Sequence, residues 1–288
     1  MSGAGARMIR ANGIAFEVFE AGTGDRLALL LHGFPEHAIS WHKQIGTLVG
    51  LGYRVWAPNQ RGYGRTTRPQ RVADYRMSHL VADVAALIDA SGARAVTLVG
   101  HDWGAAVAWF FAMRALRPLE RLVILNVPHP ALFLDVLGRS WRQKIRSWYV
   151  LAFQIPGLAE RVLGADDGRA LVRLLRQSAC EPQCFSAEEL ETYRAQAAEP
   201  GALAAMLAWY RAGARGGMAE QLALGMPPIT VPTLVIWGEA DVALGKETTY
   251  GTERYAPGVR IAYLPGVSHW VAQEAPRRVN ELLTAFLG

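Results

Sequence analysis

Short apolar runs recur along the chain and alternate with longer segments in which apolar residues return every three or four positions. The short runs predict strands at 14–20, 26–31, 53–58, 95–100, 121–127, 232–238 and 259–265. The longer segments predict helices at 37–50, 78–91, 103–116, 246–255 and 275–287. Several runs are almost wholly apolar, as expected of strands covered by helices on both faces. The alternation therefore predicts an α/β fold with a doubly wound, mostly parallel sheet.

Two residues mark where helices should begin. Ser78 is a good N-cap for the helix at 78–91, and Pro276 lies in the first turn of the helix at 275–287.

Between residues 129 and 228 the alternation stops, and helical fragments are interrupted by proline and glycine without a convincing strand. We therefore expect a core domain formed by 1–128 and 229–288, with an α-helical cap inserted at 129–228.

The composition predicts one large soluble domain and argues against a nucleic-acid partner. Of 288 residues, 51% are hydrophobic and 19% are charged, so a large core can be buried. The net charge of +5 is spread along the chain, with no basic run of five or more. Because nucleic-acid binding needs a concentrated basic surface, we expect no nucleic-acid partner.

Other features of the chain bear on metals and location. The two cysteines, Cys180 and Cys184, have no nearby histidine to complete a metal site, so we expect no metal there. The reaction that the motifs below predict implies neither a metal nor an organic cofactor, and we expect none. The N-terminal segment lacks the apolar centre of a secretory signal, and no apolar stretch approaches the length of a membrane span. These observations predict a cytoplasmic protein without a membrane partner, and they leave monomer or homodimer open.

The stretch Gly100-His101-Asp102-Trp103-Gly104 falls between a predicted strand and a predicted helix. This is the place of a nucleophile elbow, a turn so tight that residues two positions from its centre must be small. Here the central side chain is a carboxylate, presented at the N-terminus of a helix, which stabilises negative charge. Asp102 is therefore a candidate nucleophile that attacks an electrophilic carbon and forms an ester. The alternative is that Asp102 only caps the helix.

Hydrolysis of such an ester needs a base and a group that orients it. Asp241 follows the predicted strand 232–238, and His269 follows the predicted strand 259–265. Since the carboxyl ends of parallel strands meet at one edge of a sheet, these side chains should converge on Asp102. We assign His269 as the base and Asp241 as its orienting acid.

The ester's developing negative charge needs hydrogen-bond donors. His32-Gly33-Phe34-Pro35 follows another predicted strand, and this turn can direct the Phe34 backbone N–H inward. The Trp103 N–H, directly after the nucleophile, would be its partner. Together the two amides would form an oxyanion hole, and loss of one donor typically costs about 3 kcal/mol.

Taken together, these motifs resemble those of the epoxide hydrolases of the α/β-hydrolase fold, over essentially the whole chain. The matching stretches are HGFPE (32–36), RGYG (61–64), GHDWG (100–104), WGEADVALG (237–245), GVSHW (266–270), and, in the cap, WYVLAFQIPGLAE (148–160) and WYR (209–211). The core motifs are common to the superfamily, whereas the cap motifs are typical of enzymes that act on epoxides.

The resemblance implies an α/β-hydrolase fold and an epoxide and water as reactants. It also implies that Tyr149 and Tyr210 hold the epoxide oxygen and donate a proton as the ring opens. Tyrosine suits this role because, with a pKa of about 10, it stays protonated at neutral pH. The resemblance gives Glu36 a part in positioning the hydrolytic water and Trp103 a place in the substrate-binding wall. The alternative for Glu36 is an ordinary surface position.

Two other functions remain open from the sequence. A haloalkane or haloacid dehalogenase would use the same aspartate, histidine and acid on a carbon–halogen bond. Halide departure needs N–H donors, and Trp103 could supply one, but Phe34 offers no side-chain donor. A non-catalytic binding protein on the same fold is the third reading, although such proteins usually lose a triad member and this chain keeps all three.

Overall fold

An eight-stranded sheet, with strand order β1-β2-β4-β3-β5-β6-β7-β8, forms the centre of the molecule. The computed structural model describes residues 5–288. The strands are β1 Gly5–Ala11, β2 Ile14–Ala21, β3 Arg26–Leu31, β4 Arg54–Pro58, β5 Ala95–His101, β6 Arg121–Leu125, β7 Thr233–Gly238 and β8 Arg260–Leu264. Every pairing from β4 to β8 is parallel, whereas β1 and β2 pair antiparallel at one edge. The predicted mostly parallel α/β sheet is confirmed.

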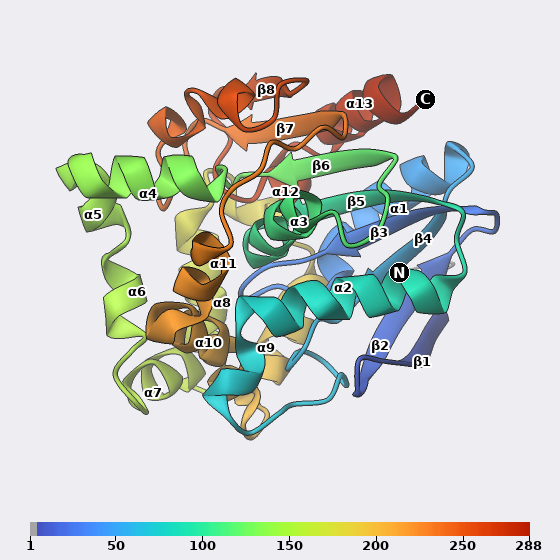
Figure 1. Cartoon of the computed structure of the whole chain (residues 1–288). Helices are drawn as coiled ribbons and strands as arrows, with labels where there is room; N and C mark the ends of the chain where they lie inside the picture. The colour runs from blue at the N-terminus through green and yellow to red at the C-terminus, as the bar shows by residue number, and fades with distance from the viewer. Residues whose placement is uncertain (1–4) are drawn as a thin grey trace.

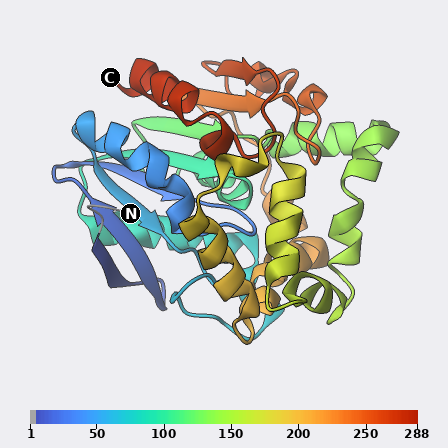
Figure 2. The ribbon, with the colours of Figure 1, turned by 180° about the vertical axis from the view of Figure 1, so that it is seen from behind.

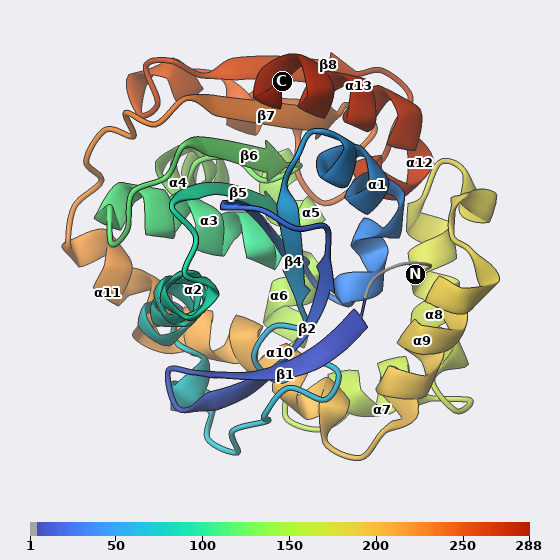
Figure 3. The ribbon, with the colours of Figure 1, turned by 90° about the vertical axis from the view of Figure 1, so that its right-hand side faces the viewer.

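Helices cover both faces of this sheet. They are α1 His42–Gly50, α2 Met77–Ser91, α3 Trp103–Arg114, α12 Val271–Glu274 and α13 Pro276–Leu287. Figure 3 shows α1 and α13 on one side of the sheet and α2 and α3 on the other. Successive side chains of a strand point to opposite faces. Accordingly, Leu27 and Leu29 of β3 pack in the core beneath α2 and α3, whereas Ala28 and Leu30 pack in the core beneath α1 and α13.

Eight further helices lie between β6 and β7 in the chain. They are α4 Pro130–Arg139, α5 Trp141–Arg146, α6 Trp148–Ala152, α7 Leu158–Gly164, α8 Arg169–Ser178, α9 Ala187–Ala198, α10 Ala202–Ala212 and α11 Met218–Ala223. Figures 1 and 2 show them gathered beyond the end of the sheet toward which β6 and β7 point. The division into a core and a cap at 129–228 stays our proposal, and residues 1–4 of the proposed core lie outside the described residues.

Two helix predictions were wrong in detail. The segment predicted as a helix at 246–255 forms two short 3-10 turns, Lys246–Thr249 and Thr252–Arg254, separated by Gly251 with φ 91°. Threonine hydroxyls there donate to nearby carbonyls, for example Thr248 to Gly245 at 2.6 Å, and such bonds compete with a helical backbone. Ser78 is not a cap, because α2 begins at Met77 and no side chain caps it.

The sequence patterns also missed β1. Most of its residues are exposed, so it carries no apolar run. Its pairing with β2 follows from the turn at Asn12-Gly13, where φ is 47° and 72°. Asn-Gly is the usual sequence for a two-residue hairpin turn with positive φ at both positions, and it was the available signal for this strand.

The helix predicted at 37–50 begins with a 3-10 turn, Ala38–Trp41, before α1.

Candidate active site

Asp102 lies at the sharp turn between β5 and α3. Its backbone has φ 49° and ψ −124°, a strained conformation for a residue with a side chain. A Cβ on Gly104 would lie 2.2 Å from the Leu31 carbonyl oxygen, and one on Gly100 would lie 2.6 Å from the Gly104 oxygen. Both flanking positions therefore require glycine. Asp102 occupies the N-cap position of α3 but its side chain makes no capping hydrogen bond, so the helix-cap alternative is wrong.

The carboxylate of Asp102 is held by the loop after β3. The Phe34 backbone N–H donates to Oδ1 of Asp102 at 2.7 Å. A Cβ on Gly33 would lie 2.2 Å from the Asp102 Cβ, so only glycine allows this approach. Burial alone would raise the pKa of Asp102, but His269, His101 and the Phe34 N–H together lower it below the usual range. The side chain is therefore ionised, as a nucleophile must be.

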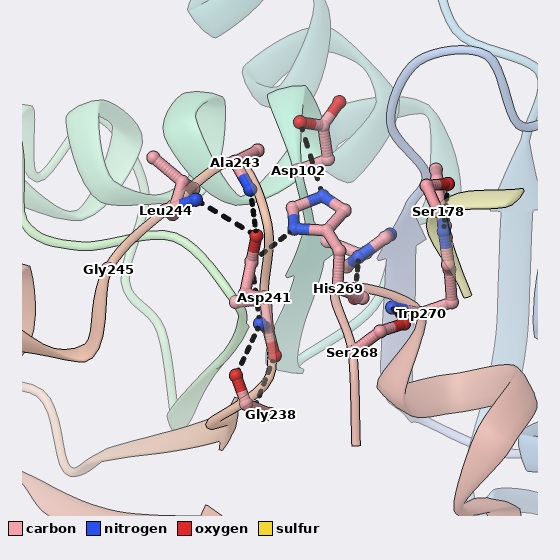
Figure 4. Close-up of polar contacts among 12 residues, drawn as sticks. Asp102, Ser178, Gly238, Asp241, Ala243, Leu244, Gly245, Ser268, His269 and Trp270 are labelled. Carbon is pink, nitrogen blue, oxygen red and sulfur yellow. Dashed lines mark hydrogen bonds and ion pairs between the residues drawn. The ribbon is translucent and has the colours of Figure 1, made fainter. Parts of the chain in front are cut away.

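His269 lies between two carboxylates, as Figure 4 shows. Its Nδ1 is 2.6 Å from Oδ2 of Asp241, and its Nε2 is 3.5 Å from Oδ2 of Asp102. Oδ1 of Asp241 accepts backbone N–H bonds from Ala243 at 2.7 Å and Leu244 at 2.9 Å. Three residues predicted from separate strand ends thus meet, with His269 hydrogen-bonded to Asp241 on one side and in ion-pair contact with Asp102 on the other.

The two carboxylates govern the charge of His269. Burial favours the neutral imidazole, but Asp241 and Asp102 outweigh it and raise the pKa of His269 well above its usual value. The pKa of Asp241 is lowered despite its burial, by His269, Asn126 and the Leu244 N–H. In the free protein, both carboxylates therefore favour the protonated form of His269.

Asn126 is a site residue that sequence reasoning missed. Its Nδ2 donates to Oδ2 of Asp241 at 2.8 Å, and its Oδ1 accepts the Gly238 N–H at 2.8 Å. It is fully buried and has φ 48°. A polar residue in the last positions of the apolar run 121–127 was the available signal, because the end of that strand adjoins the end of β7.

Glu36 and His101 form a second buried pair behind the triad. Nε2 of His101 donates to the His269 carbonyl at 2.9 Å, because a carbonyl can only accept. Its Nδ1 lies 2.6 Å from Oε2 of Glu36, a contact that needs one proton between the two atoms. Gln273 donates to Oε1 of Glu36 at 2.6 Å. Glu36 is fully buried, so its alternative surface position is wrong.

The two cap tyrosines lie together over the loop that holds Asp102. Tyr210 of α10 is buried, with its ring centroid 5.3 Å from that of Phe34 and 5.0 Å from that of Trp103. Tyr149 of α6 is half-buried, and its ring centroid lies 6.1 Å from that of Tyr210. Phe153 packs against both tyrosines.

Both tyrosines are held in the protonated form. Burial, followed by the nearby charge of Asp102, raises the pKa of Tyr149 and of Tyr210 above the usual value for tyrosine. Each phenol can therefore donate a hydrogen bond at neutral pH and transfer a proton to a stronger base. Trp103 is half-buried and its ring is 5.0 Å from that of Tyr210, so it forms part of the same aromatic wall.

A hydrogen bond joins the cap to the loop that carries His269. The indole N–H of Trp270 donates to the hydroxyl of Ser178, at the end of α8, at 2.9 Å (Figure 4). The Trp270 ring also packs edge-on against the His269 ring, with centroids 5.1 Å apart. The position of the cap is thus tied directly to the neighbour of the candidate base.

Within residues 5–288, no group of three or more histidine, cysteine, aspartate or glutamate side chains is arranged to hold a metal ion. Over the same residues, no helix has both the length and the apolar character needed to cross a bilayer.

Comparison with known proteins places this geometry in a family. A family model described as the alpha/beta hydrolase fold matches residues 29–276. The AB hydrolase superfamily protein YfhM of Bacillus subtilis is 37% identical, over 100% of this chain and 99% of that protein. Epoxide hydrolase 4 of Mus musculus is 34% identical, over 97% and 78%. The crystal structure of Epoxide Hydrolase A from Mycobacterium thermoresistibile is 32% identical, with a TM-score of 0.84 over 99% and 98%. The chain therefore belongs to the α/β hydrolase fold family, in the group formed by the epoxide hydrolases.

Proposed function

We propose that this protein converts an epoxide into a vicinal diol in two chemical steps. In the first, Oδ2 of Asp102 attacks a ring carbon, the carbon–oxygen bond of the ring breaks, and the released oxygen takes a proton from Tyr149 or Tyr210. The product of this step is an ester between Asp102 and the opened epoxide. Oδ1 is already held by the Phe34 N–H at 2.7 Å, which supports Oδ2 as the attacking atom.

In the second step, His269 removes a proton from water, and the resulting hydroxide attacks the carbonyl carbon of the ester. The negative charge that develops on Oδ1 is stabilised by the backbone N–H groups of Phe34 and Trp103. The bond from the ester carbonyl carbon to Oδ2 then breaks, so Oδ2 leaves as the second oxygen of the diol and the oxygen from water completes the carboxyl group of Asp102. That carboxyl group gives its proton to the departing Oδ2, which releases the diol and restores the carboxylate. His269 then releases the proton that it took from water, and the tyrosine that was deprotonated in the first step regains a proton from solvent.

The paired cap tyrosines are the observation that carries this proposal. Opening an epoxide releases an alkoxide, a poor leaving group that needs an acid. Tyr149 and Tyr210 lie together beside Phe34 and Trp103, which adjoin Asp102, and both have a raised pKa. A halide leaves as an anion and needs no proton, so this arrangement favours an epoxide over a haloalkane. The likeness to named epoxide hydrolases supports the same choice.

Ester formation itself should prepare the base for its task. The negative charge of Asp102 and its hydrogen bond help to raise the pKa of His269. Esterification removes that charge, so the pKa of His269 falls and the neutral imidazole becomes available to activate water. Glu36, through His101 and the His269 carbonyl, would help to hold the water and the loop in place.

The effect of Asp102 on His269 is measurable by NMR titration. In an Asp102→Asn variant we expect a lower His269 pKa than in the wild type, because one of the two facing carboxylates is lost. Asp25→Asn removes a negative charge from an exposed surface position and serves as the matched control, with no expected change. An unaltered His269 pKa in Asp102→Asn would contradict the proposed coupling.

Product analysis tests the proposed reaction. The full chain is incubated with panels of epoxides and haloalkanes, and diol formation and halide release are followed. For a substrate that reacts, a single turnover in ¹⁸O-labelled water should give an unlabelled diol and a labelled Asp102, since the diol oxygen comes from the carboxylate. Label in the first-turnover diol would mean direct attack by water. Halide release with epoxides inert would establish a dehalogenase instead, and binding of epoxides without product would establish a non-catalytic protein.

A further inference from the structure

An exposed apolar stripe runs along the outer edge of the cap. It consists of Trp141, Ile145, Trp148, Leu151, Ile155 and Leu158, whose exposed fractions range from 42% to 75%. These residues recur at steps of three or four positions along α5, α6 and the start of α7, which are three consecutive helices rather than one. Single exposed apolar residues are ordinary, but six within residues 141–158, two of them tryptophans, mark an interaction surface.

The two helices that carry four of the six stripe residues, α5 and α6, bury almost nothing of their own. Gln143 is the one buried residue of α5, and α6 has none. Figures 1 and 2 show α5 and α6 following one another along the side of the cap farthest from β1 and β2. In α6, Tyr149 packs inward on Tyr210, so the exposed Trp148 and Leu151 are left facing solvent.

The charge around the stripe is positive. From residue 136 to residue 159 the chain has three arginines and one lysine, and no aspartate or glutamate. The acidic residues at the two ends of this segment are already paired, Asp135 with Arg139 and Glu160 with Arg211. Arg142 and Lys144 are exposed, and neither side chain has an ion pair with any residue of 5–288. The stripe therefore favours a partner that is apolar inside and anionic at its surface.

We propose that the apolar stripe docks on the surface of a lipid bilayer with anionic headgroups. Tryptophan is enriched where hydrocarbon meets headgroups, and arginine and lysine extend from such a face to the phosphates. A second copy of the chain would instead bring two positive surfaces together. The contact is with the membrane surface and needs no spanning helix, and it differs from the sequence-based expectation of a protein without a membrane partner. It does not depend on the chemistry at Asp102.

Co-sedimentation of the full chain with vesicles tests this proposal. We expect binding to vesicles that contain phosphatidylglycerol, weaker binding to phosphatidylcholine alone, and loss of the difference at high salt, which screens exposed charges. Each cation near an anionic bilayer contributes about fivefold in affinity, so Arg142→Glu with Lys144→Glu should weaken binding at least about 25-fold. Trp148→Ser with Leu151→Ser should weaken it at least about tenfold, because less apolar surface is buried.

A control and a second measurement make the outcome decisive. Met8→Ser changes an exposed apolar residue of β1, at the opposite end of the molecule, and should bind vesicles as the wild type does. Circular dichroism and thermal unfolding verify that every variant is folded. The proposal is overturned if the wild type does not bind phosphatidylglycerol vesicles, or if neither double variant weakens binding. It is also overturned if light scattering shows self-association that Trp148→Ser with Leu151→Ser abolishes, without vesicle binding.

Discussion

Replacing His269 with glutamine is expected to leave the protein covalently attached to its substrate. Glutamine keeps a polar side chain of similar size but cannot accept a proton from water at neutral pH. Asp102 keeps its N–H bond from Phe34 and can still attack the epoxide. Ester formation then continues while ester hydrolysis falls by about 10²–10⁴-fold, the usual contribution of a general base. Intact-protein mass spectrometry should show an added mass equal to one whole epoxide.

Two variants define what this adduct means. Adding Asp102→Asn to His269→Gln should abolish the adduct, because no carboxylate nucleophile remains. His79→Gln makes the same chemical change at an exposed histidine at the start of α2 and should turn over normally without an adduct. An adduct equal to a haloalkane minus hydrogen halide, with epoxides unreactive, would assign the protein to the dehalogenases. Steady turnover by His269→Gln at the wild-type rate would remove His269 from the mechanism.

The parts of the fold that were predictable from sequence are those governed by local pattern. A strand covered on both faces must be apolar at nearly every position, so β3, β5 and β7 were readable as runs. Parallel strands also bring their carboxyl ends to one edge of the sheet. This allowed Asp102, Asp241 and His269 to be grouped, although Asp102 and His269 lie 167 positions apart in the sequence.

Two segments of the core were not predicted correctly from apolar periodicity. The exposed edge strand β1 has no apolar run, and only the Asn12-Gly13 turn indicated that a strand pairs with β2 there. The segment 246–255 has a helical period, but its threonine hydroxyls bond to the backbone instead. These are cases in which tertiary context or side-chain hydrogen bonding overrides periodicity.

The supporting residues of the site depend instead on contacts between segments that are distant in the sequence. Asn126 orients Asp241 from the end of β6, and its only local signal is that a polar residue falls at the end of the apolar run 121–127. The burial of Glu36 follows from His101 and Gln273, which lie 65 and 237 positions away. The arrangement of Tyr149 beside Tyr210 depends on how α6 and α10 pack, and the residues were proposed only because the cap motifs resemble those of a family.

Removing the phenol hydroxyls of the cap should stop ring opening while leaving the site assembled. In Tyr149→Phe with Tyr210→Phe, the rings that pack against Phe34, Trp103 and Phe153 remain. The acid that protonates the departing oxygen is lost, so ester formation should fall by about 10²–10⁴-fold. Each single variant should lose less, because the remaining hydroxyl still donates to the same oxygen, and the two losses should not add. The rate of adduct formation in the His269→Gln background measures this step alone.

The control is another buried tyrosine of the same cap. Tyr193 of α9 is fully buried, so Tyr193→Phe also deletes one hydroxyl from the cap interior and should leave ester formation unchanged. If the double variant formed the ester as fast as its parent, the tyrosines would have no part in ring opening. The distinction matters for the choice between epoxides and haloalkanes, because a halide departs without a proton. If ester formation slows when both hydroxyls are removed, the departing group must therefore be an oxygen that needs an acid.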